Sequence, residues 1–155
     1  MTERQSAQHA LAVGDTFSRE VTIDAASIRQ YAMLAGDHNP MHHDESVAKA
    51  SRFGSLIASG THTSALLMGV LATAISERVA SLGLGFSVRL RRAVRAGEAV
   101  SIRWKIVSIE PSRSLKGDLV VAEGELVNQA GEVAVSATSQ SIIGYGEPGT
   151  ATSWR

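Results

Sequence analysis

Hydrophobic and polar residues alternate at every second position through much of the second half of the chain. From Val100 to Ile106 the even positions are Val, Ile, Trp and Ile, whereas the odd positions are Ser, Arg and Lys. This period is typical of a strand with one buried face. Four ranges with such alternation are predicted to be antiparallel strands: 85–94, 99–109, 115–128 and 132–145. The polar connections at 110–113 and 128–131 fit hairpin turns, because they are too short for crossover helices.

The first part of the chain changes to helical spacing. The alternation over residues 17–23 predicts an early strand or extended arm, and Asp24 then stands where a helix cap would stand. Apolar residues from Ile28 onward recur at helical spacing up to Gly36, which is a stop signal. The pattern therefore predicts a first helix that ends directly before the most unusual segment of the chain.

That segment, residues 36–44, reads GDHNPMHHD and is predicted to be a structured loop. Its Gly, Asn and Pro disfavour a regular element. Asp44 is expected to cap a short helix through Ala50. The Ala- and Leu-rich stretch from Gly60 to about Ser81 predicts a long helix, apolar nearly all round, that must be enclosed. About five strands wrapped round this central helix make an α+β architecture.

Composition narrows the class of protein. The chain has 155 residues, 44% hydrophobic and 19% charged, which is typical of one globular domain. We expect that domain over residues 1–146 and a loose tail over 147–155. Lys plus Arg and Asp plus Glu number 15 each, so net charge favours neither nucleic acid nor an anionic membrane as a partner. Without cysteine there can be no disulfide, thiolate nucleophile or cysteine-based zinc site.

Location and assembly can also be predicted. Residues 1–15 interrupt with polar side chains the apolar run that a secretory signal would need, and the apolar stretch 64–75 is shorter than the roughly 20 residues of a membrane span. We therefore expect a cytoplasmic protein with no membrane partner. Long edge strands would pair with a second copy, so a homodimer or higher homo-oligomer is expected.

Asp37 and His42 are the candidate acid–base pair. Pro40 between them fixes one backbone angle, so both side chains can be aimed at one point. Imidazole exchanges protons near neutral pH and a carboxylate can orient and deprotonate water, which together suit the hydration of an activated double bond. Gly60, at the expected amino end of the long helix, can offer an unpaired N–H to an anionic carbonyl oxygen.

Two stretches resemble a known family. The sequence YAMLAGDHNPMH over residues 31–42, followed by FGSLIASG over residues 53–60, looks like the signature of the MaoC-like dehydratases and (R)-specific enoyl-CoA hydratases. The resemblance runs from about Leu11 to Ile143 and implies a hotdog fold. It also implies a trans-2-enoyl thioester of coenzyme A or a carrier protein as substrate, an (R)-3-hydroxyacyl product, and no metal or redox cofactor.

The family's functional residues can be carried over by position. The resemblance places the catalytic aspartate on Asp37, the catalytic histidine on His42 and the oxyanion glycine on Gly60. Asn39 and Pro40 correspond to residues that shape the loop, and we count both as candidate substrate-binding residues.

The chain also departs from the family's pattern. Ser59 stands where many members have His, Met68 where some hydratases have Ser, and Thr61 where members with an ASG motif often carry a larger residue. His43 and His62 are additional imidazoles near the site. Ser59, Thr61 and His62 are therefore candidate substrate-binding residues, and the acyl pocket is expected to differ from that of other members.

Structural alternatives remain open for these residues. Asp37 could cap loop amides and His42 could be a buried histidine satisfied by backbone. The loop could in principle hold zinc or iron, although so many ligands in so few residues cannot all converge without a scaffold. A basic stripe could meet the phosphates of coenzyme A, but a solvated strand face is the favoured interpretation. That stripe consists of Arg89, Arg91, Arg92 and Arg95.

Two other functions compete with hydration. A thioesterase of the same fold would use a carboxylate at or near the central helix, but the helix start from Gly60 to Ala65 contains neither Asp nor Glu. A non-catalytic acyl-binding module would keep the fold without the reaction. The intact pair of Asp37 and His42 in the preceding loop favours hydration over both alternatives.

Overall fold

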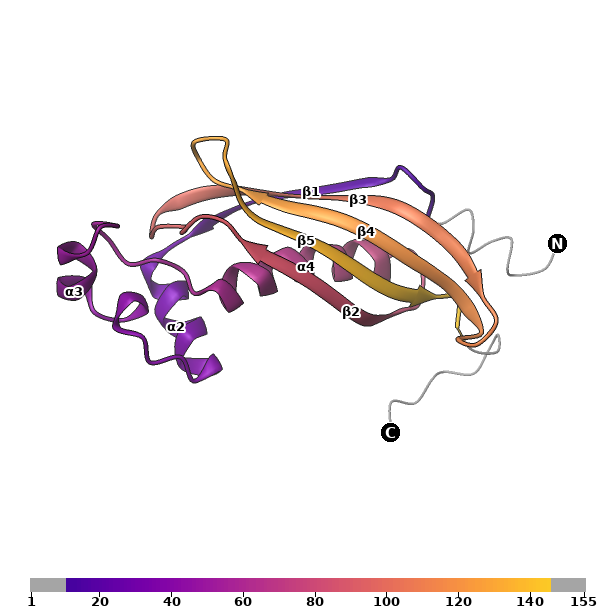
Figure 1. Ribbon diagram of the computed structural model, residues 1–155, viewed down its shortest axis with the longest axis horizontal. Helices are drawn as coiled ribbons and strands as arrows, with labels where there is room; N and C mark the ends of the chain where they lie inside the picture. The colour runs from indigo at the N-terminus through magenta and orange to yellow at the C-terminus, as the bar shows by residue number, and fades with distance from the viewer. Residues whose placement is uncertain (1–10, 146–155) are drawn as a thin grey trace.

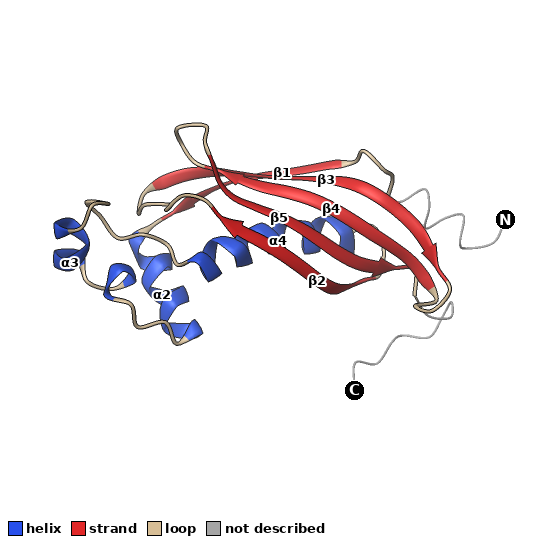
Figure 2. Ribbon diagram, in the orientation of Figure 1, coloured by secondary structure: helices blue, strands red, loops and turns tan. Residues whose placement is uncertain are grey.

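The computed structural model describes residues 11–145, which form one antiparallel sheet and a set of helices. The sheet has five strands in the order β1-β3-β4-β5-β2 (Figure 2). Neighbouring strands are antiparallel throughout. The strands are β1 (Thr16–Ile23), β2 (Ser81–Leu90), β3 (Glu98–Ser112), β4 (Gly117–Val127) and β5 (Val133–Ile143). The expected α+β architecture of about five strands around one helix is confirmed.

The helices divide into one central helix and a small group at one end of the molecule. The central helix α4 (Gly60–Ser76) lies along one face of the sheet, and α2 (Ala25–Ala35) and α3 (Glu45–Ala50) gather beside its amino end (Figure 1). A 3-10 turn, η1 (Pro40–His42), lies between α2 and α3. No helix within residues 11–145 is long and apolar enough to span a membrane.

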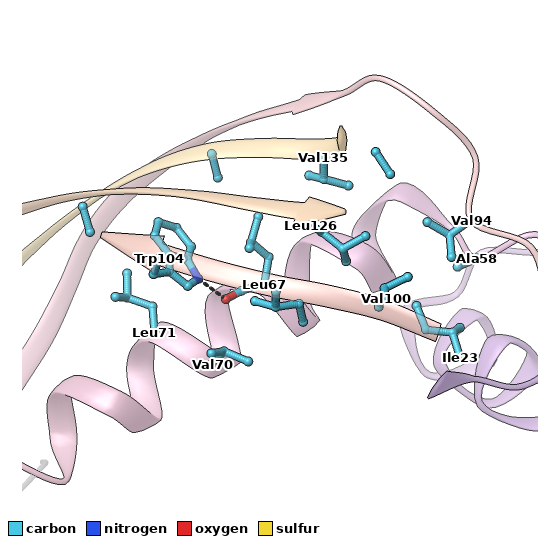
Figure 3. Close-up of a cluster of buried hydrophobic side chains, with 14 of the residues drawn as sticks. Ile23, Ala58, Leu67, Val70, Leu71, Val94, Val100, Trp104, Leu126 and Val135 are labelled. Atoms are coloured by element: carbon cyan, nitrogen blue, oxygen red, sulfur yellow. Dashed lines mark hydrogen bonds between the residues drawn. The ribbon is translucent and has the colours of Figure 1, made fainter. Parts of the chain in front are cut away.

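The core lies between the sheet and α4, as the alternation over Val100 to Ile106 predicts. Trp104 is 2% exposed and donates its indole N–H to the carbonyl of Leu67, a residue of α4, at 2.7 Å (Figure 3). Gly124 pairs with Trp104 across the β3–β4 ladder, and a Cβ at Gly124 would overlap the indole ring. The sheet and the helix are thus joined by both apolar packing and one directed hydrogen bond.

Local signals at the ends of α2 and α3 are confirmed. The Asp24 carboxylate accepts from the Ser27 N–H at 2.7 Å, and Gly36 ends α2 with a left-handed φ of 72°. Asp44 caps α3 by accepting from the backbone N–H groups of Ser46 and Val47. The Ser46 hydroxyl also donates to the Asp44 carboxylate. This bond is the largest cause of the lowered pKa of Asp44, and the two backbone bonds add to it.

Some predicted boundaries are wrong. The central helix ends at Ser76 rather than near Ser81, and β2 covers Ser81–Leu90 rather than 85–94. The ladder between β2 and β5, where Ser81 pairs with Ile143, takes residues whose local pattern continues the helix, so tertiary pairing overrides propensity. Phe86, an aromatic residue of the type usually buried in a core, is 60% exposed on the edge strand β2.

The turn residues are also partly different from those predicted. The β4–β5 hairpin turns at Asn128–Gly131 as expected, but Glu110–Ser112 belong to β3, and the β3–β4 turn follows them. The loop at 36–44 is not wholly irregular, because Pro40 starts the short 3-10 turn. The predicted tail, residues 147–155, lies outside the described residues, as do residues 1–10.

Candidate functional site

The loop after α2 is built from side chains that bond to the backbone of their own turn. The N–H of Asn39 donates to Asp37 Oδ1 at 3.0 Å, and the N–H of Met41 donates to Asn39 Oδ1 at 3.1 Å. Pro40 opens the 3-10 turn, where its missing N–H costs no hydrogen bond. Asn39 and Pro40 therefore shape the loop as predicted, and both are exposed.

Asp37 and His42 face each other within this loop. His42 Nδ1 lies 2.7 Å from the carbonyl oxygen of Ile57. Because a carbonyl can only accept, Nδ1 carries the proton and Nε2 is left as an acceptor in the neutral ring. This Nε2 lies 3.4 Å from Asp37 Oδ2. The sequence could not reveal the part played by Ile57, because its carbonyl is brought to the ring only by the fold.

The side chains of Asp37 and His42 differ in their exposure to solvent. The side chain of His42 is 7% exposed, whereas that of Asp37 is 35% exposed. Their separation is longer than the roughly 2.7–2.9 Å of a tight charged hydrogen bond. The pair is thus a fixed, buried imidazole beside a carboxylate that is partly open to solvent.

The other polar residues of the loop differ in their contacts. His38 is exposed, Asp44 caps α3, and His43 Nε2 lies 2.6 Å from the backbone carbonyl oxygen of Asp37. Among residues 11–145, no group of three or more His, Asp or Glu side chains is placed to hold a metal ion.

At the amino end of α4, Gly60 lies between the polar side chains of Ser59 and Thr61 and beside Leu90. Ser59 is the N-cap, and its hydroxyl accepts from the His62 N–H at 3.2 Å and lies 3.1 Å from the Thr61 hydroxyl. Within the described part of the chain, no hydrogen bond involves the Gly60 N–H. The side chain of Leu90 occupies the space where a Cβ of Gly60 would lie. The overlap is with the end of a flexible side chain that is 59% exposed, so a Cβ at Gly60 would displace Leu90 rather than meet a rigid wall.

His62, the additional imidazole at the start of α4, is buried against α2. It is 5% exposed, and its ring stacks on that of Tyr31 with centroids 4.6 Å apart. Its Nδ1 is buried and without a hydrogen-bond partner in the described structure. Burial, and to a smaller extent a charge on His42, lower the pKa of His62. This stacked pair could not be predicted from the sequence, because Tyr31 lies on a different helix, α2.

Two cavities meet at Gly60. The larger, about 570 Å³, runs between α4 and β2 and has mainly apolar walls that include Tyr31, Met68 and Phe86. The smaller, about 240 Å³, is lined by Arg91 and Arg92. Gly60 and Leu90 belong to both, and Asp37 and His42 line neither. Of the predicted substrate-binding residues at this helix end, Thr61 lines the larger cavity, whereas Ser59 and His62 line neither.

The arginines of the predicted basic stripe bond to different partners. Arg92 pairs with Glu132 at 2.9 Å, and Arg95 donates to the carbonyl of Phe53 at 2.9 Å. Arg91 donates to the Ser136 hydroxyl at 3.1 Å, and Arg89 lies on the outer face of β2. Arg92 and Arg95 are thus committed to partners within the chain, whereas Arg89 and Arg91 line the same surface hollow.

Comparison with known proteins supports the resemblance. Residues 3–129 match the family described as MaoC like domain. A 3-hydroxybutyryl-CoA dehydratase of Methylorubrum extorquens is 30% identical over 123 residues, covering 74% of this chain and 78% of the relative. A solved MaoC-like dehydratase from Rhodospirillum rubrum has a TM-score of 0.75 and 32% identity, covering 91% of this chain and 97% of that one.

A second solved structure, the unliganded (R)-hydratase of Pseudomonas aeruginosa, has a TM-score of 0.75 and 26% identity, covering 86% of this chain and 82% of the other. The antiparallel sheet wrapped against the long helix α4 is thus the hotdog fold that the resemblance implied. By sequence match and by structure, the chain belongs to the MaoC-like dehydratase family, a family of hydro-lyases.

Proposed function

We propose that this protein adds water to a trans-2-enoyl thioester to give an (R)-3-hydroxyacyl thioester, and catalyses the reverse dehydration. One observation carries the proposal: Asp37 Oδ2 and His42 Nε2 face each other at 3.4 Å, while the other imidazole nitrogen is committed to Ile57. Relatives named as a 3-hydroxybutyryl-CoA dehydratase and an (R)-hydratase support this reaction type. The chemistry needs no metal or redox cofactor.

In the proposed reaction, a water held by Asp37 and His42 attacks C3 of the enoyl group. Its oxygen bonds to C3, one O–H bond breaks, and the released proton passes to the pair. The C2=C3 electrons move toward the thioester carbonyl to form an enolate. The pair then delivers a proton to C2, so one water is added overall and no further reactant is consumed.

The enolate oxygen would be stabilised by the Gly60 N–H. This group lies in the first turn of α4, where unpaired N–H groups and the helix dipole favour negative charge. The Ser59 hydroxyl, which bonds to the His62 N–H, supports the geometry of that turn. We therefore assign Gly60 to the catalytic site and Ser59, Thr61 and His62 to its immediate surroundings.

The two cavities at Gly60 suit the two parts of a thioester. An acyl chain fits the apolar cavity of about 570 Å³ that Met68 and Phe86 line. The cavity of about 240 Å³ with Arg91 and Arg92 suits the phosphate-bearing arm of coenzyme A or of an acyl carrier protein, because guanidinium groups bind phosphate well. Gly60 lies where the thioester would join these parts.

Hydrolysis of the thioester is the competing reaction. A hotdog hydrolase would need a carboxylate close to the carbonyl carbon, and the first turn of α4 has no acidic residue. The carboxylate of Asp37 instead lies in the preceding loop beside His42. This placement favours hydration over hydrolysis and over a non-catalytic acyl-binding role.

Association into a homodimer or higher homo-oligomer is proposed from the edge of the sheet. Strand β2 pairs only with β5 among the described strands, which leaves its other edge open. Apolar side chains on β2 are exposed, with Phe86 at 60% and Leu90 at 59%. An open apolar edge strand favours pairing with a second copy. Light scattering coupled to size exclusion would measure the mass of the assembly.

We also propose that one catalytic domain spans residues 1–146 and that the protein works in the cytoplasm. The absence of cysteine is compatible with a reducing compartment. Expression of residues 11–145 alone, followed by the activity assay below, would show whether the described part is sufficient.

One assay separates the three functions. The purified protein is incubated with crotonyl-CoA while enoyl absorbance and free thiol are followed together. Loss of enoyl absorbance without thiol release is expected. Thiol release would instead indicate a thioesterase, and binding of crotonyl-CoA without either change would indicate a non-catalytic module. Chiral analysis of the 3-hydroxybutyryl product is expected to give the (R) form, and an (S) product would contradict the stereochemical part of the proposal.

A further inference from the structure

We propose that His43 is a positioning residue that holds Asp37 at its working distance from His42. The inference rests on the proposed hydration reaction and on a contact that the reaction itself does not use. His43 Nε2 lies 2.6 Å from the backbone carbonyl oxygen of Asp37. Since the carbonyl can only accept, Nε2 must carry a hydrogen and donate it. The bond therefore closes the turn from residue 37 to residue 43.

The closed turn contains the whole catalytic pair. Asp37 stands at one end of the ring, and His42 directly precedes His43 at the other. A second bond holds the His43 end of the turn, because Arg29 donates from Nε to the carbonyl of His43 at 3.2 Å. Arg29 also pairs with Glu45 at 2.7 Å, which ties the loop to both α2 and α3. His43 is thus anchored to the helices by its backbone and to Asp37 by its side chain.

Asp37 needs this restraint more than His42 does. The His42 ring is buried and fixed through Nδ1 to the Ile57 carbonyl. The Asp37 side chain is 35% exposed, and its Oδ1 is bonded only to an N–H of the same loop, that of Asn39. Among the described residues, His43 supplies the side-chain hydrogen bond to the Asp37 carbonyl. The Asp37 N–H is held by the Ala32 carbonyl at 2.9 Å, so loss of the His43 bond would free the carbonyl side of the residue and let the carboxylate shift relative to the imidazole.

A displacement of this kind acts on the rate of the chemical step more than on binding. A shift of roughly 1 Å in a catalytic group can cost on the order of 100-fold in rate. His43 lines neither cavity at Gly60, so its loss should leave substrate binding nearly unchanged. A group that acts only through Asp37 should therefore lower kcat and leave KM within about two-fold.

The test compares His43→Leu with His43→Gln, whose side-chain amide can donate in place of Nε2–H. For crotonyl-CoA hydration, His43→Leu is expected to lower kcat by about 10- to 100-fold at constant KM. His43→Gln is expected to recover kcat to within about three-fold of the wild type. His38→Leu, which removes an exposed imidazole from the same loop, serves as the matched control and should leave both constants unchanged.

Crystal structures of the three proteins give a readout independent of activity. The Asp37–His42 separation should be kept in the wild type and in His43→Gln, and should be longer or variable in His43→Leu. Wild-type kcat in His43→Leu, an equal loss in both His43 variants, or an unchanged separation in His43→Leu would overturn the inference. If the wild type does not hydrate crotonyl-CoA, the proposed function has failed, and the measured separations alone decide the role of His43.

Discussion

Replacement of Asp37 by Asn is the sharpest test of the catalytic pair, because it changes the charge and leaves the shape. Asp37 Oδ1 accepts from the Asn39 N–H at 3.0 Å, and an Asn side chain can accept the same bond. The Asp37 side chain is 35% exposed, and an amide N–H can donate to Nε2 of the buried, neutral His42 ring, so the contact is replaced rather than lost. The free energy of unfolding is therefore expected to change by less than about 0.5 kcal/mol.

The effect on catalysis should be much larger. Facing His42 Nε2 at 3.4 Å, an amide cannot take a proton from water. General acid–base catalysis typically contributes about 10²- to 10⁴-fold. At about 1.36 kcal/mol for each factor of ten, the barrier should rise by roughly 3–5 kcal/mol. The loss should appear in kcat for crotonyl-CoA hydration, followed by enoyl absorbance, with thermal unfolding recorded on the same samples.

Asp44→Asn is the matched control, since it makes the same change in the same loop. Asp44 caps α3, and Asn is about as good a cap as Asp. Its activity and stability should match those of the wild type. The reasoning fails if Asp37→Asn keeps more than about a tenth of wild-type kcat. It fails equally if Asp44→Asn loses as much activity as Asp37→Asn.

Three further predictions concern pH, substrate range and packing. The pKa of His62 is lower in the folded protein than its usual value of about 6.5. Below that pH the unfolded chain binds a proton at His62 more readily than the folded protein does, so the free energy of unfolding falls as pH falls. His62→Phe should make chemical denaturation midpoints less dependent on pH between about pH 7 and 5, and an unchanged slope would refute this. Met68→Phe should fill part of the cavity of about 570 Å³ and lower kcat/KM for octenoyl-CoA at least about ten-fold relative to crotonyl-CoA, as steady-state kinetics would show. Gly124→Ala should overlap the Trp104 ring and cost about 1–3 kcal/mol in urea unfolding, whereas Gly83→Ala, with no atom near its Cβ, should cost less.

Features that depend on neighbouring residues were predictable from the sequence. The caps at Asp24 and Asp44 reflect contacts within a few positions along the chain, and the alternation over Val100 to Ile106 shows which face of the strand is buried without showing what covers it. The spacing of Asp37 and His42 in one short loop belongs to the same class, since the loop's own hydrogen bonds bring the two together.

Features that depend on distant segments were not predictable in this way. The start of β2 at Ser81 is set by pairing with β5, and the pattern of residues near Ser81 cannot reveal that distant partner. The same is true of the Ile57 carbonyl that orients His42 and of the Tyr31 ring stacked on His62. Each contact joins segments that only the folded sheet and helices bring together.

Gly60 shows why a residue's structural and chemical roles must be tested separately. Its position at the start of α4 suggested an oxyanion site, and a Cβ there would also displace the Leu90 side chain, which lines both cavities at Gly60. Loss of activity in Gly60→Ala would therefore not distinguish the two roles. Asp37 carries no such packing constraint, since its carboxylate is partly exposed and bonded only within its loop. The chemistry of this site is consequently best tested at the loop, where a change of charge can be made without a change of fold.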